Sequence, residues 1–220
     1  MVFKYSDRTM FHGNQRLSIA KLDAADRYSE VVFGTGLVSV SAMKDEAEVT
    51  NFPADDVADH ATIAGASLLK GNLTFMQLDP NVRVKFFGQE ETKNKKGFAS
   101  VGVYPQRLVQ FVTLGTKRDG TRALLVTVYP NMSVTSKPSK QTTTDSADKP
   151  TAVNWEAEVQ ASGSDYYLTE SGRKSSEFEY IFTGADVDKV LDFIDAGGII
   201  TPTYVPGTTA APASSVVLPA

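Results

Sequence analysis

The sequence predicts a mainly β fold, a sandwich or barrel-like domain with one flanking α-helix and long loops. Three observations support this prediction. Apolar and polar residues alternate along several short segments, as they do in strands with one buried face. Only one longer stretch repeats its apolar residues at helical spacing, and two long polar stretches separate the strands. With 220 residues, 41% hydrophobic and 22% charged, the chain has the composition of a globular protein with a packed core.

Two half-buried strands are predicted in the first part of the chain, at residues 36–42 and 72–77. Their apolar residues recur at every second position, which places them on one face of a pleated strand. The apolar residues are Val38, Val40, Leu73 and Phe75, and the polar residues that alternate with them are Ser39, Ser41, Asn72 and Thr74.

A β-hairpin is predicted in the middle of the chain. The apolar runs 107–116 and 122–128 are joined by a short polar connection that contains Asp119 and Gly120. This Asp-Gly pair supplies the positive φ that a tight hairpin requires. The second arm, with the sequence ALLVTV, is apolar on both faces, which indicates a strand that is covered on both sides.

Two later strands combine an apolar face with an acidic face. Residues 153–160 and 177–182 each alternate apolar and polar positions. Because neighbouring residues of a strand point to opposite faces, one face of each strand should belong to the core and the other should be polar. The carboxylates on the polar faces are Glu156, Glu158, Glu177 and Glu179.

The main helix is predicted over residues 186–195 and should lie against the sheet. Thr183 and Asp186 resemble a capping box at its start, and Gly197 and Gly198 can close its end. The apolar residues at helical spacing are Val187, Val190, Leu191 and Ile194.

A second, shorter helix is expected over residues 80–87. Asp79 is a suitable N-cap because its side chain can accept a hydrogen bond from the first turn. Pro80 suits the first helical position, where its missing N–H costs nothing, and Gly88 marks the end of the segment.

Two long polar connections, 44–66 and 135–151, exceed the usual loop length of a compact domain. Loops of this length commonly have a function or become ordered on a partner. Residues 201–220 are rich in Pro, Thr, Ala and Ser and have too few apolar residues for a core of their own. We therefore expect one domain over residues 1–200, followed by an extended arm or linker stub over residues 201–220.

Composition argues against several kinds of function. The chain has no cysteine, and therefore no disulfide, thiolate metal site or cysteine nucleophile. Its net charge is -4, and no stretch concentrates Lys and Arg as a phosphate-binding surface would. Residues 1–8 are too polar for a secretion signal, and no apolar run is long enough to span a bilayer.

Candidate catalytic and metal-binding groups are sparse. His12 and His60 are far apart in sequence and have no second ligand of a recognisable zinc site nearby. Asp55, Asp56 and Asp59, with His60, form the one cluster suited to a hard cation. Their spacing matches no standard calcium loop, so a solvated acidic turn is the preferred interpretation. We therefore expect neither a cofactor nor enzyme activity.

Two other functional classes fit parts of the sequence. A glycoside hydrolase could use paired carboxylates such as Glu156 and Glu158, but carboxylates repeated along one strand face usually form a solvated surface. A carbohydrate-binding or adhesion module would need an exposed aromatic platform. Trp155 instead shares a strand face with Val153 and Val159, which favours core packing.

Residues 34–71 are more specific than a generic β protein: GTGLVSVSAMKDEAEVTNFPADDVADHATIAGASLLKG. The order of TGLVSV, DEAE, PADDV with DH, a small-residue stretch and LLKG resembles the major tail protein, or tail tube protein, of siphophages. These are long, non-contractile-tailed bacteriophages, here those of lactic acid bacteria. VNWEAEVQAS and SEFEYIF near the last helix add to the resemblance, which covers about residues 1–200.

The resemblance implies a structural virion protein with a tail-tube fold that assembles in the host cytoplasm into stacked hexameric rings. The rings would form the tail tube, the conduit for DNA ejection. Implied partners are further copies of the chain, a tape-measure protein, and tail-terminator and baseplate proteins. DNA would pass without specific binding, and no membrane would be involved. Closing strands of several subunits into one ring would also remove exposed strand edges.

Two groups of candidate assembly residues follow. The connection 44–66 resembles the family's loop that reaches adjacent subunits or rings, and its candidate contact residues are Lys44, Asp45, Glu46, Glu48, Phe52, Asp55, Asp56, Asp59 and His60. A polar or acidic lumen wall would leave DNA phosphates unbound. The candidate wall residues are Ser39, Ser41, Asn72, Thr74, Glu156, Glu158, Glu177 and Glu179. The pattern leaves open which of these faces meet the lumen, a neighbour or solvent.

Overall fold

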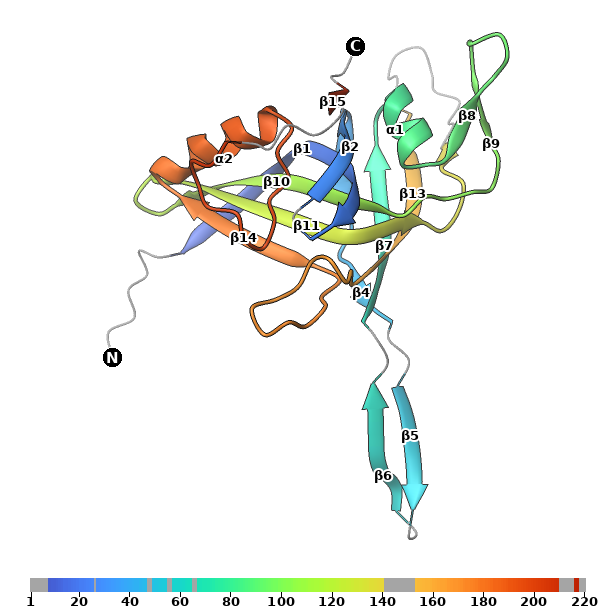
Figure 1. Ribbon diagram of the computed structural model, residues 1–220, viewed down its shortest axis with the longest axis vertical. Coiled ribbons are helices and arrows are strands. Elements are labelled where there is room, and N and C mark those ends of the chain that lie inside the picture. Colours follow the sequence, from blue (N-terminus) through green and yellow to red (C-terminus); the bar gives the residue numbers. More distant parts are fainter. Residues whose placement is uncertain are drawn as a thin grey trace, which may run out of the picture.

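A computed structural model describes residues 8–25, 27–46, 49–54, 57–64, 67–140, 153–209 and 216–217. The described chain is mainly β, with one large sheet, two separate two-stranded hairpins and two helices (Figure 1). This confirms the predicted fold class. The helices are α1 Pro80–Lys85 and α2 Ala185–Asp195. The strands are β1 Thr9–Ala24, β2 Arg27–Gly34, β3 Leu37–Val40, β4 Lys44–Asp45, β5 Val49–Ala54, β6 Val57–Ala64, β7 Leu68–Phe75, β8 Gln89–Glu91, β9 Phe98–Ser100, β10 Arg107–Lys117, β11 Arg122–Val134, β12 Ser139–Lys140, β13 Trp155–Ser162, β14 Phe178–Thr183 and β15 Val216–Val217.

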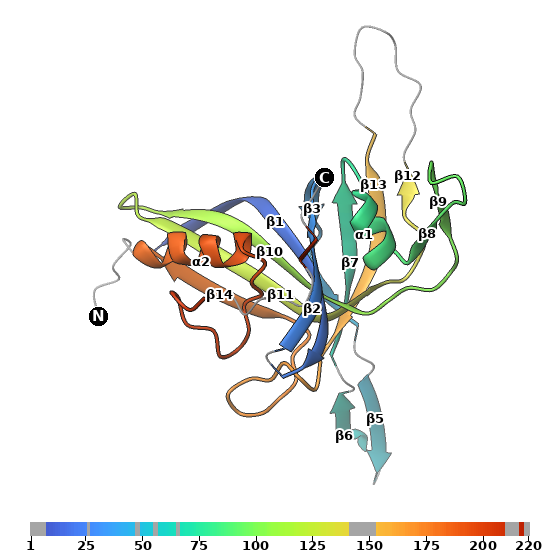
Figure 2. The same cartoon turned by 45° about the horizontal axis from the view of Figure 1, so that its top comes forward.

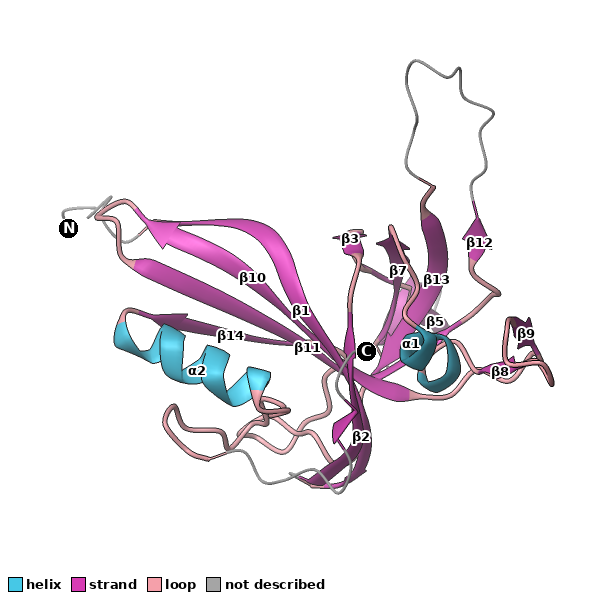
Figure 3. Ribbon diagram, turned by 90° about the horizontal axis from the view of Figure 1, so that it is seen from above, coloured by secondary structure: helices cyan, strands magenta, loops and turns pink. Residues whose placement is uncertain are grey.

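The large sheet follows the order β15-β2-β1-β10-β11-β13-β7-β3, and β14 also pairs with β11. β11 changes its partner along its length: residues 123–128 pair with β14, and residues 131–134 pair with β13. Pro130 lies at this change, where a residue without an N–H interrupts no ladder. The sheet therefore has two halves, β1-β10-β11-β14 and β3-β7-β13, which lie at an angle in Figure 3.

β1 also bends where the two halves meet. Its pairing with β10 shifts register between Gln15 and Ser18, and Arg16 has a φ of 53° within this bulge. A bulge adds one residue to a strand and bends it locally. Arg16 donates two hydrogen bonds to Asp195 at the end of α2, Nε to Oδ1 at 2.7 Å and Nη2 to Oδ2 at 3.1 Å. This bidentate pair fixes the bend of β1 relative to α2.

Two hydrophobic cores hold the sheet. α2 packs on one face of the β10-β11-β14 strands, where its buried residues meet Leu124, Val126 and Val128. The other core lies around α1 and the β7-β13 strands and includes Phe75, Phe86, Phe87, Phe111 and Tyr129. α2 is the helix that the sequence predicts against the sheet. All four residues of its predicted apolar stripe are buried.

Most local predictions are confirmed. β10 and β11 form the predicted hairpin, and Gly120 has a φ of 84° in its turn. α1 begins as predicted, because the Asp79 side chain accepts a hydrogen bond from the Asn81 N–H at 2.8 Å. α2 also closes as predicted: the N–H groups of Gly197 and Gly198 donate to the carbonyls of Ile194 and Phe193, both at 2.9 Å.

The predicted capping box of α2 is wrong. Thr183 is the last residue of β14, and Gly184, with a φ of 62°, is the N-cap without a side-chain hydrogen bond. A single residue thus connects the strand to the helix, which leaves no turn for a capping side chain. The predicted direction of Val38 is also wrong. A bulge between Leu37 and Ser39 turns Leu37 and Val40 toward the core and leaves Val38 47% exposed.

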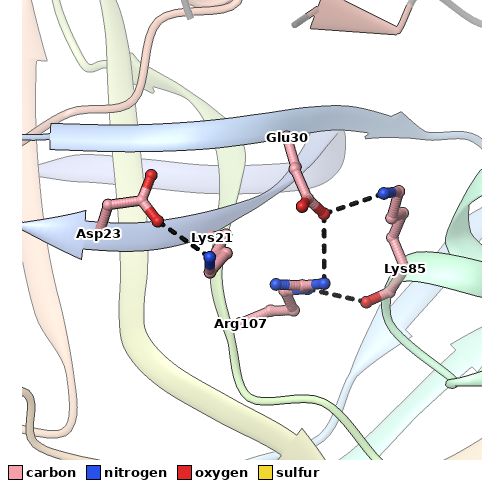
Figure 4. A network of polar contacts seen from close by, with 5 residues as sticks. All are labelled: Lys21, Asp23, Glu30, Lys85 and Arg107. Carbon is pink, nitrogen blue, oxygen red and sulfur yellow. Dashed lines mark hydrogen bonds and ion pairs between the residues drawn. The ribbon is translucent and has the colours of Figure 1, made fainter. Parts of the chain in front are cut away.

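A polar network ties α1 to the sheet (Figure 4). Glu30 on β2 has a φ of 52°, and its Oε2 accepts hydrogen bonds from Lys85 Nζ at 2.9 Å and Arg107 Nη2 at 3.3 Å. Arg107 Nε also donates to the carbonyl of Lys85 at 2.9 Å. The hydrogen bond from Lys85, with the nearby cations, lowers the pKa of Glu30 below its ordinary value.

We expect Glu30→Gln to lower the free energy of unfolding at pH 7 by about 1 kcal/mol, because the amide loses a partly exposed ion pair with Lys85 and Arg107. Since the pKa of Glu30 is lowered in the folded state, its contribution is present above 4.5, the ordinary value, and is lost as the pH falls. Urea unfolding at pH 7 and pH 3 should therefore show a larger difference between variant and wild type at pH 7 than at pH 3. An equal difference at both values would contradict this role.

Candidate functional site

One half of the sheet has a partly open face. Leu124 and Val126 of β11 point toward α2, so Leu125 and Thr127 point to the opposite side. Near the bend this opposite side is covered by the second core. It opens at β14, where Ile181 is 61% exposed, whereas Ala123 at the tip of β11 is buried. We call this surface the open face. Of the residues predicted from the sequence, Glu177 and Glu179 belong to it.

Acidic and neutral polar groups line the open face near the bend, and strand alternation places one cation, Lys117, on the same side at the tip of β10. Glu179 is the register partner of Thr127, which places both side chains on the same side of the sheet. The Tyr129 hydroxyl donates a hydrogen bond to Glu177 at 2.7 Å. Burial raises the pKa of Tyr129, and the hydrogen bond to Glu177 raises it further, so the phenol stays protonated and remains a donor. Thr113 donates to Asn14 at 2.8 Å on the same face.

The other six candidate wall residues share a different polar surface, on β3, β7 and β13 and the residues beside them. Asn72 joins its parts: its side-chain amide donates to Glu156 at 2.7 Å, and its backbone N–H donates to the Ser41 hydroxyl at 2.7 Å. Ser136 donates to Glu158 at 3.2 Å. The structure thus places Glu177 and Glu179 on one surface and Ser39, Asn72, Thr74, Glu156 and Glu158 on another, while Ser41 borders both, because it also lines a hollow with Glu177 and Glu179.

The half-sheet β1-β10-β11-β14 ends in two strands that pair on one side only, within the residues that the structure describes. β14 pairs with β11, and the stretch of β1 from Thr9 to Gln15 pairs with β10 alone, since β2 joins β1 only from Leu17 onward. Each strand therefore presents backbone N–H and C=O groups along an outer edge. β1 is not predicted from the sequence, since its residues mix apolar, polar and charged types without a regular period.

The connection 44–66 is not a loop but contains a β-hairpin, β5 with β6, which pair only with each other (Figures 1 and 2). It projects away from the sheet. At its base, Asp45 accepts hydrogen bonds from the Ser67 hydroxyl at 3.0 Å and the Leu68 N–H at 3.2 Å, and Glu46 forms an ion pair with Lys70 at 2.7 Å. The base is thus held by the sheet.

The nine candidate contact residues divide along this hairpin. Lys44 and Asp45 form β4, Glu46 follows it, Phe52 lies in β5, and Asp59 and His60 lie in β6. Glu48, Asp55 and Asp56 lie outside the described residues. The strands could have been predicted from Val49, Thr50, Val57, Thr62 and Ile63, which are β-branched, and from the two-residue separation of the strands, the length of a tight hairpin.

The geometry offers little support for catalysis or sugar binding. No group of three or more metal-ligating side chains occurs among the described residues. Trp155 is half-buried, and its ring is covered by the Arg83 guanidinium at 4.8 Å and approached by Lys140 Nζ at 5.8 Å. A flat aromatic platform for a sugar is therefore not available there. No helix of the described chain is long and apolar enough to cross a membrane.

These features define a class of protein: a β-rich structural subunit with open strand edges and a projecting hairpin. Comparison with known proteins is more specific. The model of the phage tail tube protein family matches residues 1–206, and the chain belongs to this family. It is a structural component of the virion and not an enzyme, as predicted.

Residues 141–152, within the second predicted long loop, lie outside the described residues.

Similar proteins come from phages of one bacterial genus. The tail tube proteins of Lactococcus phages F4-1, SK1 and p2 are each 33% identical to this chain over 228 aligned residues. The matches cover 100% of this chain and 74% of each relative. They confirm the resemblance that residues 34–71 indicated.

Proposed function

We propose that the chain assembles into hexameric rings that stack into the phage tail tube, the conduit through which DNA is ejected. The observation that carries this proposal is the pair of open edges on β1 and β14. Neighbouring strands of the half-sheet β1-β10-β11-β14 are all antiparallel, so the two edge strands run in opposite directions. The family of the chain supports a tube; the ring and its six copies are the proposal.

Copies related by rotation about the ring axis keep the same strand direction along that axis. β14 of one copy and β1 of the next copy would therefore meet as an antiparallel pair, and the half-sheets would continue into one closed barrel. Closure satisfies the edge N–H and C=O groups that an isolated subunit leaves to water. Because each open edge pairs with the edge of a neighbouring copy, assembly of the ring also removes the exposed strand edges.

The inner wall of such a barrel would be one face of the half-sheet. α2 covers one face, so the open face with Glu177 and Glu179 is the face we assign to the lumen. Carboxylates and neutral polar groups release no counterions from DNA phosphates, so DNA would slide with little friction. The hairpin β5-β6 would reach an adjacent subunit or ring. A tape-measure protein and the terminator and baseplate proteins would set the ends of the tube.

Electron microscopy tests the assembly. Purified protein at high concentration, imaged by negative stain, should form rings or tubes, and the same chain should be found in the tails of virions. We expect six subunits per ring in top views. A protein that stays strictly monomeric under all such conditions and is absent from virions would contradict the proposal.

A further inference from the structure

β1 carries an unusual exposed side chain at its open edge. Met10 is 73% exposed. The register pairs Met10 with Thr116 and His12 with Leu114, and Leu114 packs against the α2 core. Met10 and His12 therefore lie on the same side of the sheet as α2. The exposure of Met10 places it outside the area that α2 of the same copy covers.

A hollow surrounds this methionine. It has a volume of about 610 Å³, is mostly apolar, and includes Met10 and His12 of β1 and Thr116 of β10. Lys117 and Arg118, at the turn between β10 and β11, add positive charge to its rim. We call this apolar surface with a cationic rim the Met10 surface.

The opposite open edge, on β14, carries complementary groups on the same side of the sheet. Phe182 packs against the Tyr204 ring with 6.1 Å between centroids, and Val205, the next residue, is 60% exposed. Asp186 and Asp188 lie in the first turn of α2, close after the end of β14, where they form exposed ion pairs with Lys189 at 3.1 Å and Arg122 at 2.6 Å of the same copy. We call this apolar edge with its adjoining carboxylates the Phe182 surface.

The register shows that the two surfaces lie at the same end of the strands. Paired residues form one row across the half-sheet: His12, Leu114, Leu124 and Phe182. If β1 of a second copy continued the sheet beyond β14, its Met10 would lie on the same side as Phe182. A closed barrel requires a register shift between copies, but a shift by two residues keeps each side chain on its face.

We propose that the Met10 surface of one copy binds the Phe182 surface of the next copy in the ring, outside the lumen. The inference rests on the proposed function and identifies the side-chain contact that fixes its direction. Met10 would pack against the rings of Phe182 and Tyr204, a favourable sulfur–aromatic contact. Arg118 of one copy would face Asp186 of the next, so that opposite charges meet across the interface.

Cysteine cross-linking tests this contact, because the natural chain has no cysteine. The double variant Met10→Cys with Val205→Cys is treated with a short bismaleimide under conditions in which the wild-type chain assembles. Denaturing gels should show a ladder of covalent oligomers that ends at six. Each single variant should stay monomeric. A matched control, Met10→Cys with Val103→Cys, places the second thiol at a residue that is 69% exposed elsewhere and should give no ladder.

The outcomes separate the two proposals. A double variant that assembles into tubes without cross-linking would overturn the contact and leave the ring in place. A wild-type chain that does not assemble would overturn both. A ladder in the control pair as strong as in the Met10–Val205 pair would also overturn the contact, since the reaction would then report only random collisions.

A charge exchange tests the polar part independently. Arg118→Glu should raise the protein concentration needed for assembly by about tenfold, and Asp186→Arg should do the same, because each places like charges across every interface of the ring. The double variant Arg118→Glu with Asp186→Arg should recover most of the loss. Circular dichroism checks that all three stay folded. Two single effects that simply add in the double variant would overturn the pairing.

Discussion

Deleting residues 47–66 is expected to abolish tube formation and to leave a folded subunit. The hairpin β5-β6 pairs only with itself and projects away from the sheet (Figure 1). The cut ends already lie side by side, because the Glu46 N–H donates to the Leu68 carbonyl at 2.9 Å. A short Gly-Ser turn can therefore replace the hairpin without disturbing the sheet. Negative-stain microscopy measures assembly, and urea unfolding measures the fold.

The assembly state of the deletion variant shows which neighbour the hairpin contacts. Isolated rings without tubes would mean that it joins one ring to the next, whereas monomers would mean that it joins neighbours within a ring. A matched control replaces residues 93–96, the tip of the β8-β9 hairpin, by another short turn and should leave tubes intact. Unfolding of the deleted chain would show that the hairpin belongs to the core, and normal tubes would contradict its role in assembly.

Local signals in the sequence predict the elements whose pattern is regular. The β10-β11 hairpin has two apolar arms and an Asp-Gly turn, and α2 has an uninterrupted apolar stripe, so both follow from residues close in sequence. The start of α1 depends on Asp79 and Pro80 alone. In each case the residues that specify the element are neighbours along the chain, although the α2 stripe packs on the distant strand β11, which is why pattern and structure agree.

The sequence does not predict correctly which side chains of the irregular strands face the core. The bulge in β3 turns Val38 outward, and the bulge in β1 changes the inward face along one strand, so a strict period of two gives the wrong side. Pro53 within β5 similarly argues against a strand, although a hairpin with free outer edges tolerates proline. Register and edge exposure depend on partners that are distant in sequence.

The candidate wall shows the same limit. Alternation correctly identifies the polar positions of β13 and β14, but Glu156 and Glu179 belong to different surfaces. Their separation follows from the switch of β11 from β14 to β13 at Pro130, which no local pattern of either strand contains. Family resemblance gives the class of protein, and only the pairing of distant strands separates the open face from the other polar surface.

A pair of charge reversals decides which surface meets DNA. Glu179→Lys is expected to slow DNA ejection at least about tenfold, because each ring would then place lysines on the open face where phosphates could replace their counterions. Glu156→Lys introduces the same charge on the β7-β13 surface and should leave the rate close to that of wild type. Ejection from virions that carry each variant is followed by the fluorescence of a DNA-binding dye.

Salt dependence separates DNA binding from faulty assembly. If the lysines of Glu179→Lys retain phosphates, added salt should restore the ejection rate, since each contact then competes with more counterions. A misassembled tube would stay slow at every salt concentration. Tail length by electron microscopy checks that both variants build normal tubes. Slow, salt-sensitive ejection in Glu156→Lys with normal ejection in Glu179→Lys would reverse the assignment and place the β3-β7-β13 surface in the lumen.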